Sequence, residues 1–162
     1  GLAREGLLRF KFQGASAGAE SLGGLVAQCA AERFSREFDT VTWVPVSKKR
    51  LRQRGYDQAR LLAESACRRW DTKAVALLRK VEDTPAQSGL TEAAARRANV
   101  LGVYEALPEA EEKRILLVDD ICTTGATLTE CVRVLKGAGA KSVCCAAVAL
   151  TRQKKVHKTG KK

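Results

Sequence analysis

The sequence predicts an α/β fold, built as an open, mostly parallel twisted sheet with helices on both faces. The first observation is a set of short, β-branched and apolar runs, at 41–46, 74–78, 114–119 and 142–150. The second is that segments with apolar residues at helical spacing separate these runs. Strands that alternate with helices pair in parallel through right-handed crossovers. The length of 162 residues suits one domain with a sizeable core.

Three helices are predicted, over 21–38 before the first strand, and over 58–70 and 127–137 between later strands. In the first, apolar residues recur three and four positions apart, which gives the helix one apolar face. Asp57 is an expected N-cap of the second helix, because its carboxylate can accept from the first backbone amides. A Gly-Ala-Gly run follows the third helix and is typical of a helix end.

The strands over 41–46 and 114–119 both end in polar sequence. In open parallel sheets, ligands bind beyond the carboxyl ends of the strands. We therefore expect the basic segment after Val46 and the acidic, hydroxyl-rich segment after Val118 to face one pocket. Trp43, within the first strand, is expected in the core.

Two adjacent carboxylates, Asp119 and Asp120, follow the apolar strand and precede a loop of small residues. That loop is Thr123, Thr124, Gly125, Ala126 and Thr127. It leads into a helix, whose N-terminal amides and dipole favour an anion. Ionised carboxylates only accept hydrogen bonds, so the pair suits ribose hydroxyls or a hydrated Mg²⁺ ion. An ordinary strand–loop–helix corner is the alternative, although adjacent carboxylates repel and contribute little to a fold without a cation or hydroxyls nearby.

This run resembles the phosphoribosyl pyrophosphate (PRPP) loop of the type I phosphoribosyltransferases, in the order strand, acidic pair, Thr-Thr-Gly-Ala-Thr and helix. The resemblance implies that Asp119 and Asp120 are the catalytic pair, contact the ribose 2′ and 3′ hydroxyls, and hold Mg²⁺ indirectly. It also implies that residues 123–127 surround the 5′-phosphate.

The net charge of +11 is concentrated in two segments. Residues 47–54 and 152–162 together hold eleven Lys and Arg and no acid, so they carry the whole excess. Concentrated cations favour polyanions, here the phosphates of a small ligand, a nucleic-acid backbone or both. In the enzymes that the chain resembles, the first segment is the pyrophosphate-binding loop, which implies that role for Ser47, Lys48 and Lys49. The other cations of this segment either extend the anion site or are simply solvated.

Further segments resemble the ComF-like competence family, a branch of the phosphoribosyltransferase-fold proteins. They are residues 6–12, 54–59, 84–90 and 96–100. Tyr56-Asp57 replaces a more usual Phe-Asn, and the family's cysteine-rich zinc-binding N-terminal segment is not in this chain. The chain starts at Gly1 and contains no methionine, so we expect a processed or truncated form.

The segment 81–99 is polar and corresponds, in related enzymes, to a mobile flap that closes over the substrate and excludes water. A plain exposed loop with a short helical piece would have the same composition. The flap residues that we expect to contact the ligand are Gln87, Arg96 and Asn99, and Arg54, in the basic segment, is a further candidate.

The resemblance implies an enzyme of the glycosyltransferase class that transfers phosphoribosyl from PRPP to a nitrogen acceptor, with Mg²⁺ as cofactor and pyrophosphate as product. The alternatives are a PRPP sensor, or a non-enzymatic competence and DNA-uptake factor that binds single-stranded DNA. Against DNA binding, aromatic residues make up only 5% of the chain, which leaves few stacking platforms. The acceptor would be selected by a variable hood, here residues 1–20 with or without the basic tail.

The remaining expectations concern the cysteines, the membrane, the domain organisation and the oligomeric state. Six cysteines show no Cys-x-x-Cys spacing, which argues against a zinc site and for buried, reduced thiols. No apolar run approaches the roughly 20 residues that span a bilayer, so we expect no membrane insertion and a cytoplasmic protein. We expect residues 1–151 to form a single domain and 152–162 a flexible basic tail. Related proteins often pair, so a homodimer is a further expectation.

Overall fold

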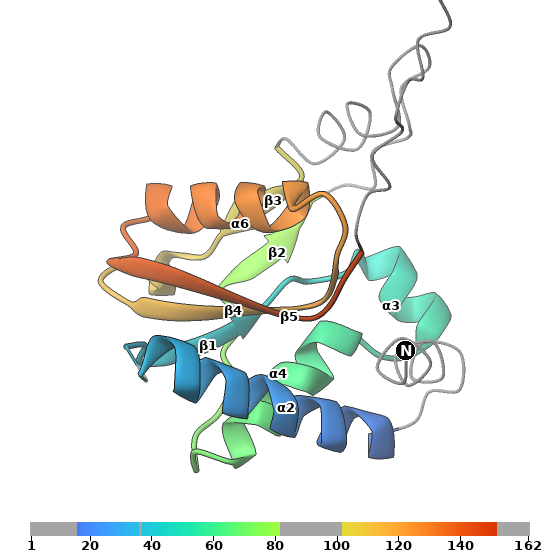
Figure 1. Ribbon diagram of the computed structural model, residues 1–162. Coiled ribbons are helices and arrows are strands. Elements are labelled where there is room, and N and C mark those ends of the chain that lie inside the picture. The colour runs from blue at the N-terminus through green and yellow to red at the C-terminus, as the bar shows by residue number, and fades with distance from the viewer. Residues whose placement is uncertain (1–15, 36, 82–101, 152–162) are drawn as a thin grey trace, which may run out of the picture.

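A three-stranded parallel sheet forms the centre of the protein. The computed structural model describes residues 16–35, 37–81 and 102–151. The strand order is β1 (Thr40–Trp43), β4 (Arg114–Cys122) and β5 (Ser142–Leu150). Helices α2 (Ser16–Phe34) and α4 (Gln58–Arg68) cover one face of the sheet, and α6 (Ala126–Gly137) covers the other (Figure 1). The predicted α/β class with helices on both faces is therefore confirmed.

A small antiparallel hairpin lies beside this sheet. It consists of β2 (Leu78–Lys80) and β3 (Tyr104–Ala106), and the short 3₁₀ helix Pro108–Ala110 follows it. The prediction of a strand over 74–78 was wrong, because only its last residue belongs to β2. The preceding residues run beside β1 with isolated hydrogen bonds, such as the one from the Val75 amide to the Val41 carbonyl (2.9 Å).

The predicted helices are present with shifted ends. Helix α2 begins five positions before the predicted start and ends at Phe34, where Ser35 takes a left-handed conformation with φ of +45°. Asp57 caps α4 as predicted, and its side chain accepts from the Arg60 amide. Helix α6 begins one residue before the predicted start and ends at Gly137.

The basic segment after β1, predicted to be a loop, forms helix α3 (Lys48–Arg54). The side chain of Ser47 accepts a hydrogen bond from the Arg50 amide (3.2 Å) and caps the start of the helix. Gly55 ends it with φ of +79°, and its amide donates to the Leu51 carbonyl (2.8 Å). These two caps define a helix in a segment whose charged sequence has no apolar face.

The central strand β4 joins two apolar cores. Leu116 and Val118 pack with α2 and α4 on one side of the sheet, whereas Ile115 and Leu117 pack with α6 and the hairpin on the other. This alternation follows from the two-residue period of a strand. The four side chains are fully buried, so the carboxyl end of β4 is held rigidly. Trp43 lies in the first core, as predicted.

The six cysteines are all free thiols. Cys67 and Cys131 are buried, as predicted, but Cys29 is exposed, so the prediction that it packs in the core was wrong. Cys144 and Cys145 pack against opposite cores, which is the expected result for neighbours in a strand. Among the helices of the described residues, none combines the length and apolar character that crossing a membrane requires.

Candidate functional site

A polar pocket of about 160 Å³ lies at the carboxyl ends of β1 and β4. Its lining residues are Val44, Pro45, Val46, Arg50, Asp57, Gln58, Ala59, Lys80, Tyr104, Asp119, Asp120, Ile121 and Thr127. The expectation that the ends of these two strands share one pocket is therefore met. Of the predicted site residues, the structure brings Asp119, Asp120 and Thr127 together in this lining.

Each carboxylate of the acidic pair is oriented by a hydrogen bond from the backbone amide of the next residue. The Asp120 amide donates to Oδ1 of Asp119 (2.8 Å), and the Ile121 amide donates to Oδ1 of Asp120 (2.8 Å). Asp119 is buried and Asp120 half-buried, and both belong to β4, which runs three residues further than predicted. The two aspartates therefore lie within a strand that is hydrogen-bonded to β5, rather than in the loop after the strand.

The loop after β4 turns sharply into helix α6. Gly125 caps the helix in the left-handed region with φ of +79°, a conformation that favours glycine. The Ala126 amide donates to Oγ1 of Thr124 (3.2 Å), and the Thr129 amide donates to the Gly125 carbonyl (2.9 Å). The first turn of a helix presents amides and a positive dipole end, which suits an anion beside Thr127. Thr123 is exposed and outside the pocket lining.

Helix α3, which follows β1, contributes one cation to the pocket lining. Lys48, Lys49 and Arg50 are all exposed, and Arg50 is the member of this group that lines the pocket. Ser47 is buried and engaged in the helix cap. Arg54 lies outside the lining, and its Nη1 donates to Oε1 of Gln58 (3.1 Å).

Asp57 ties the end of β1 to the start of α4 and was predicted only as a helix cap. Its Oδ2 accepts from the Val46 amide (3.2 Å) and its Oδ1 from the Arg60 amide (3.3 Å). Burial raises the pKa of this carboxyl, the negative charge of Asp120 acts in the same direction, and the backbone hydrogen bonds oppose both. The pocket therefore places a third carboxyl near the acidic pair.

Gln58 has an unused hydrogen-bond donor at the pocket. Its side chain is 2% exposed, and its Nε2 atom has no hydrogen-bond partner within the described part of the chain. A buried donor without a partner costs about 1–3 kcal/mol. A ligand oxygen that reached this atom would remove the cost.

Lys80 and Tyr104 reach the pocket from the hairpin. They are paired across β2 and β3, and Nζ of Lys80 lies 5.7 Å from the centre of the Tyr104 ring. Burial raises the pKa of Tyr104, so the side chain stays a neutral phenol. Neither residue belongs to a local sequence motif. The pairing of β2 with β3 brings them to the site from separate segments of the chain.

The donor set suits a hydrated Mg²⁺ ion. The adjacent carboxylates of Asp119 and Asp120 supply the oxygen ligands that Mg²⁺ prefers. Residues 16–35, 37–81 and 102–151 contain no group of three or more His, Cys, Asp or Glu that would enclose a metal. Mg²⁺ commonly keeps several waters and binds through one or two carboxylates together with substrate phosphates, which this site allows.

Several predicted residues lie outside the described residues. They are the flap residues Gln87, Arg96 and Asn99, most of the proposed hood, and the basic tail at 152–162. The last five residues of the hood segment, 16–20, form the first turn of α2.

Comparison with known proteins gives consistent results. A family model described as the phosphoribosyl transferase domain matches residues 52–162. Competence protein F of Haemophilus influenzae is 34% identical over 104 residues, which is 62% of this chain and 45% of that protein. DNA utilization protein YhgH of Escherichia coli is 31% identical over 109 residues, 65% of this chain and 46% of that protein. Competence protein ComFC of Streptococcus pneumoniae is 34% identical over 100 residues, 62% of this chain and 43% of that protein.

Among solved structures, the chain is similar to glutamine PRPP amidotransferase from B. subtilis, with a TM-score of 0.54 and 23% identity. That similarity covers 80% of this chain and 26% of the other, and it concerns the fold. The chain spans a little under half the length of the curated relatives described above. By its family match and its curated relatives, the chain belongs to the phosphoribosyl transferase domain family, in the ComF-like branch.

Proposed function

We propose that this protein binds PRPP, or a related ribose 5-phosphate, together with Mg²⁺ and transfers the phosphoribosyl group to a nitrogen acceptor with release of pyrophosphate. The observation that supports the proposal is a single pocket whose lining includes Asp119, Asp120, Arg50 and Thr127, the last in the first turn of α6. Carboxylates recognise sugar hydroxyls, whereas cations and helix amides recognise phosphates.

The acidic pair and the loop after it would hold the two ends of the ribose phosphate. Asp119 and Asp120 would accept hydrogen bonds from the 2′ and 3′ hydroxyls. Residues 123–127 would surround the 5′-phosphate with amides and hydroxyls. Cleavage at the anomeric carbon develops positive charge on the sugar, so fixing its orientation next to carboxylates favours the reaction.

The cations of the pocket would receive the pyrophosphate. Arg50 and Lys80 line the pocket, and Lys48 and Lys49 stand on the same short helix as Arg50. Their charges would stabilise the leaving group, and Gln58 Nε2 would donate to one of its oxygens. Mg²⁺, when bound, would neutralise phosphate charge that the protein cations leave uncompensated.

Calorimetric titration with PRPP, with and without Mg²⁺, tests the binding step. We expect Mg²⁺-dependent binding by the unaltered chain, and affinities at least about tenfold weaker for Asp119→Asn and Asp120→Asn, because each loses a hydrogen bond to a charged acceptor. Asp71→Asn is the matched control, since Asp71 is exposed and asparagine tolerates its φ of +51°. Equal affinities in all four proteins would overturn the proposal, as would a lack of binding.

Catalysis needs a separate measurement. Pyrophosphate release from PRPP, followed with a panel of bases and amines, should show turnover with at least one acceptor. Tight PRPP binding without turnover would instead support a PRPP sensor. The two experiments together distinguish a binding failure from a catalytic failure.

A second function, binding of single-stranded DNA, is favoured by the names of the relatives and by the exposed cations of α3. Those relatives are called competence and DNA utilization proteins, and α3 presents five exposed Lys and Arg. Such binding should weaken as salt rises. Replacing Lys49 and Arg52 with Gln should reduce affinity and the salt dependence, whereas the same change at Arg68 and Lys73, exposed on another part of the surface, should have little effect. An affinity that is independent of salt would exclude this function.

A further inference from the structure

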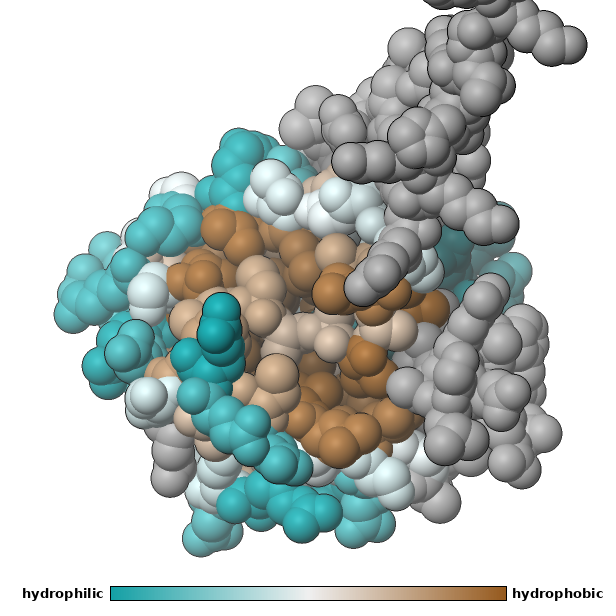
Figure 2. All heavy atoms as spheres, viewed as in Figure 1, coloured by the Kyte–Doolittle hydropathy of each residue, from teal (hydrophilic) through white to brown (hydrophobic). Residues whose placement is uncertain are grey.

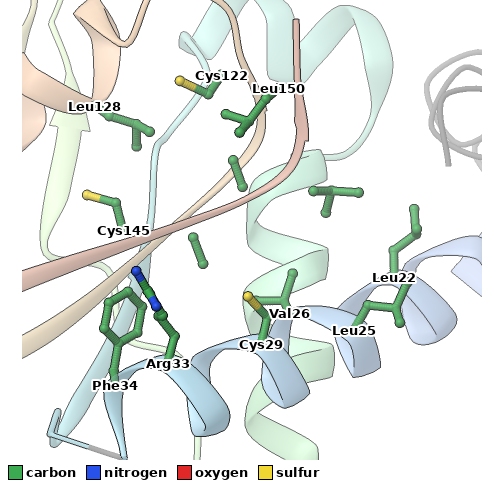
Figure 3. Close-up of a pocket in the computed structure, with 13 residues that line it drawn as sticks. Leu22, Leu25, Val26, Cys29, Arg33, Phe34, Cys122, Leu128, Cys145 and Leu150 are labelled. Atoms are coloured by element: carbon green, nitrogen blue, oxygen red, sulfur yellow. The ribbon is translucent and has the colours of Figure 1, made fainter.

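An apolar groove of about 510 Å³ runs along the outer edge of the sheet, between α2 and α6. Helix α2 contributes Leu22, Leu25, Val26 and Cys29 to its lining, and β5 contributes its last residue, Leu150 (Figure 3). Figure 2 shows the same face as a broad hydrophobic patch. Leu25 is 58% exposed and Leu150 75% exposed. Contiguous apolar surface of this kind marks a place where another segment or molecule binds.

Among the residues that the structure describes, the backbone of β5 has no neighbouring strand at this groove. In the described part of the chain, β5 pairs with β4 and forms the end of the sheet. Its sequence, Ser142–Leu150, is apolar almost throughout, yet none of its residues is fully buried. Natural proteins usually blunt or cover an edge strand, because exposed amides and carbonyls pair with other strands. The edge is therefore suited to one more strand.

The sequence just before α2 has the pattern of such a strand. Residues 8–13 read Leu-Arg-Phe-Lys-Phe-Gln, so apolar and polar residues alternate strictly. Alternation over six residues is typical of a strand with one buried face. Gly14 and Ala15 separate this segment from the start of α2 at Ser16. A two-residue connection is an ordinary length between a strand and a helix.

The topology accommodates a parallel strand at this position. Helix α2 begins at the end of the groove where β5 finishes, so a segment that leads into α2 would run parallel to β5 (Figure 1). From β4, the chain passes through α6 on one face of the sheet and returns as β5, which lies one position nearer this edge. From the added strand, the chain would pass through α2 on the other face of the sheet and return as β1, away from this edge. Both crossovers are then right-handed, as nearly all such connections are.

We propose that residues 8–13 add to the edge of β5 as a fourth parallel strand of this sheet. Leu8, Phe10 and Phe12 fill the groove on the α2 side. Arg9 and Lys11 lie on the other face, where their long side chains extend to solvent. The tether to α2 makes docking an intramolecular event with a high effective concentration, which favours this segment over a second copy of the chain. This inference is independent of the proposed ligand.

A cysteine scan of the full chain tests the proposal. Each of residues 8 to 13 is replaced in turn with cysteine, and its alkylation rate is measured by peptide mass spectrometry. We expect positions 8, 10 and 12 to react at least about tenfold more slowly than positions 9, 11 and 13, because docked apolar side chains react only after local opening. Similar rates at all six positions would overturn the proposal, whether all are fast or all are slow.

The native thiol of Cys29 provides a second readout that needs no new cysteine. Docking should protect Cys29, and Phe10→Asp should expose it, whereas Lys11→Asp, on the opposite face, should leave it protected. Equal Cys29 reactivity in these two variants would contradict the proposal. Protection that appears only as protein concentration rises, together with a dimer mass by light scattering, would assign the groove to a second copy instead.

Discussion

Gln58 carries a buried polar group that no hydrogen bond of the described residues satisfies. Its side chain is buried at the pocket, Oε1 accepts from Arg54, and Nε2 has no partner among the described residues. An unsatisfied buried donor destabilises the protein until something accepts its hydrogen bond. Residues that reduce stability but complete a site are expected where function requires them.

Gln58→Met therefore separates stability from binding. We expect the free energy of unfolding to stay within about 1 kcal/mol of the original or to rise, because an unsatisfied donor is removed at similar volume. We expect PRPP affinity to fall roughly five- to tenfold, the value of one hydrogen bond. Urea unfolding and calorimetry measure the two effects.

The exposed Gln53 on α3 provides the control for this substitution. Gln53→Met should change neither stability nor affinity. If Gln58→Met lost stability and kept its affinity for PRPP, Gln58 would be a structural residue with no role in ligand binding.

At this scale, local sequence predicts part of the site. The adjacent carboxylates and Thr127 belong to one continuous run, so the motif alone placed them at the pocket. Lys80 and Tyr104 could not be predicted, because the pairing of β2 with β3 brings them there from separate segments. Asp57 and Gln58 lie within a short motif, but only the folded structure shows that they line the pocket.

Helices α2 and α4 pack closely through small residues. A Cβ atom added at Gly23 would lie 2.4 Å from both Cβ and Oγ of Ser65. Ser65 also donates to the Glu20 carbonyl (3.2 Å), which fixes the two helices at this point. At the neighbouring Gly24, the nearest atoms belong to the flexible end of the Arg69 side chain, at 3.1 Å.

The two adjacent glycines should respond oppositely to the same substitution. Gly23→Ala should lower the free energy of unfolding by about 1–3 kcal/mol, because the helices must move apart. Gly24→Ala should be neutral or stabilising by up to about 1 kcal/mol, because alanine favours the helix and Arg69 can move aside. Chemical unfolding of both variants checks this. Equal effects would show that the close approach of α2 and α4 is not rigid.

The elements that sequence predicted best have strong apolar patterns. The strand over 142–150 was predicted with its observed ends, and α6 within one residue. Helix α3 was missed because its Lys- and Arg-rich sequence has no apolar periodicity, and only Ser47 and Gly55 signalled its two ends. The hairpin strands are three residues each, too short to give a pattern.

Across the whole molecule, each of the two cores holds a thiol that burial keeps protonated. Cys67 packs in the core under α2 and α4, and Cys145 packs on the side of α6. Burial raises the pKa of each from its ordinary value of 9.0 to about 11. The folded state therefore retains protons that the unfolded chain releases between these two values.

Stability should consequently fall as pH rises from about 9 toward 11, since the unfolded state binds fewer protons in this range. Urea unfolding at several pH values, under reducing conditions, measures the slope. Replacing Cys67 and Cys145 together with alanine should make the slope less steep, whatever the loss of packing does to stability at pH 7. Burial also raises the pKa of Cys131, so this thiol retains its part of the slope. An unchanged slope in the double variant would contradict this assignment.

The class of the whole fold was predictable because alternating strands and helices leave few topologies. What covers the outer edge of β5 was not predictable before the sheet order was known. The alternating pattern at residues 8–13 acquires meaning only beside an edge strand with an apolar groove.

A crystal structure with ribose 5-phosphate tests the central claim most directly. We predict that the phosphate lies at the first turn of α6 within residues 123–127, with the ribose hydroxyls on Asp119 and Asp120. Ligand bound elsewhere on the protein would contradict the account. So would a pocket that stays empty at saturating ligand while its own side chains fill it.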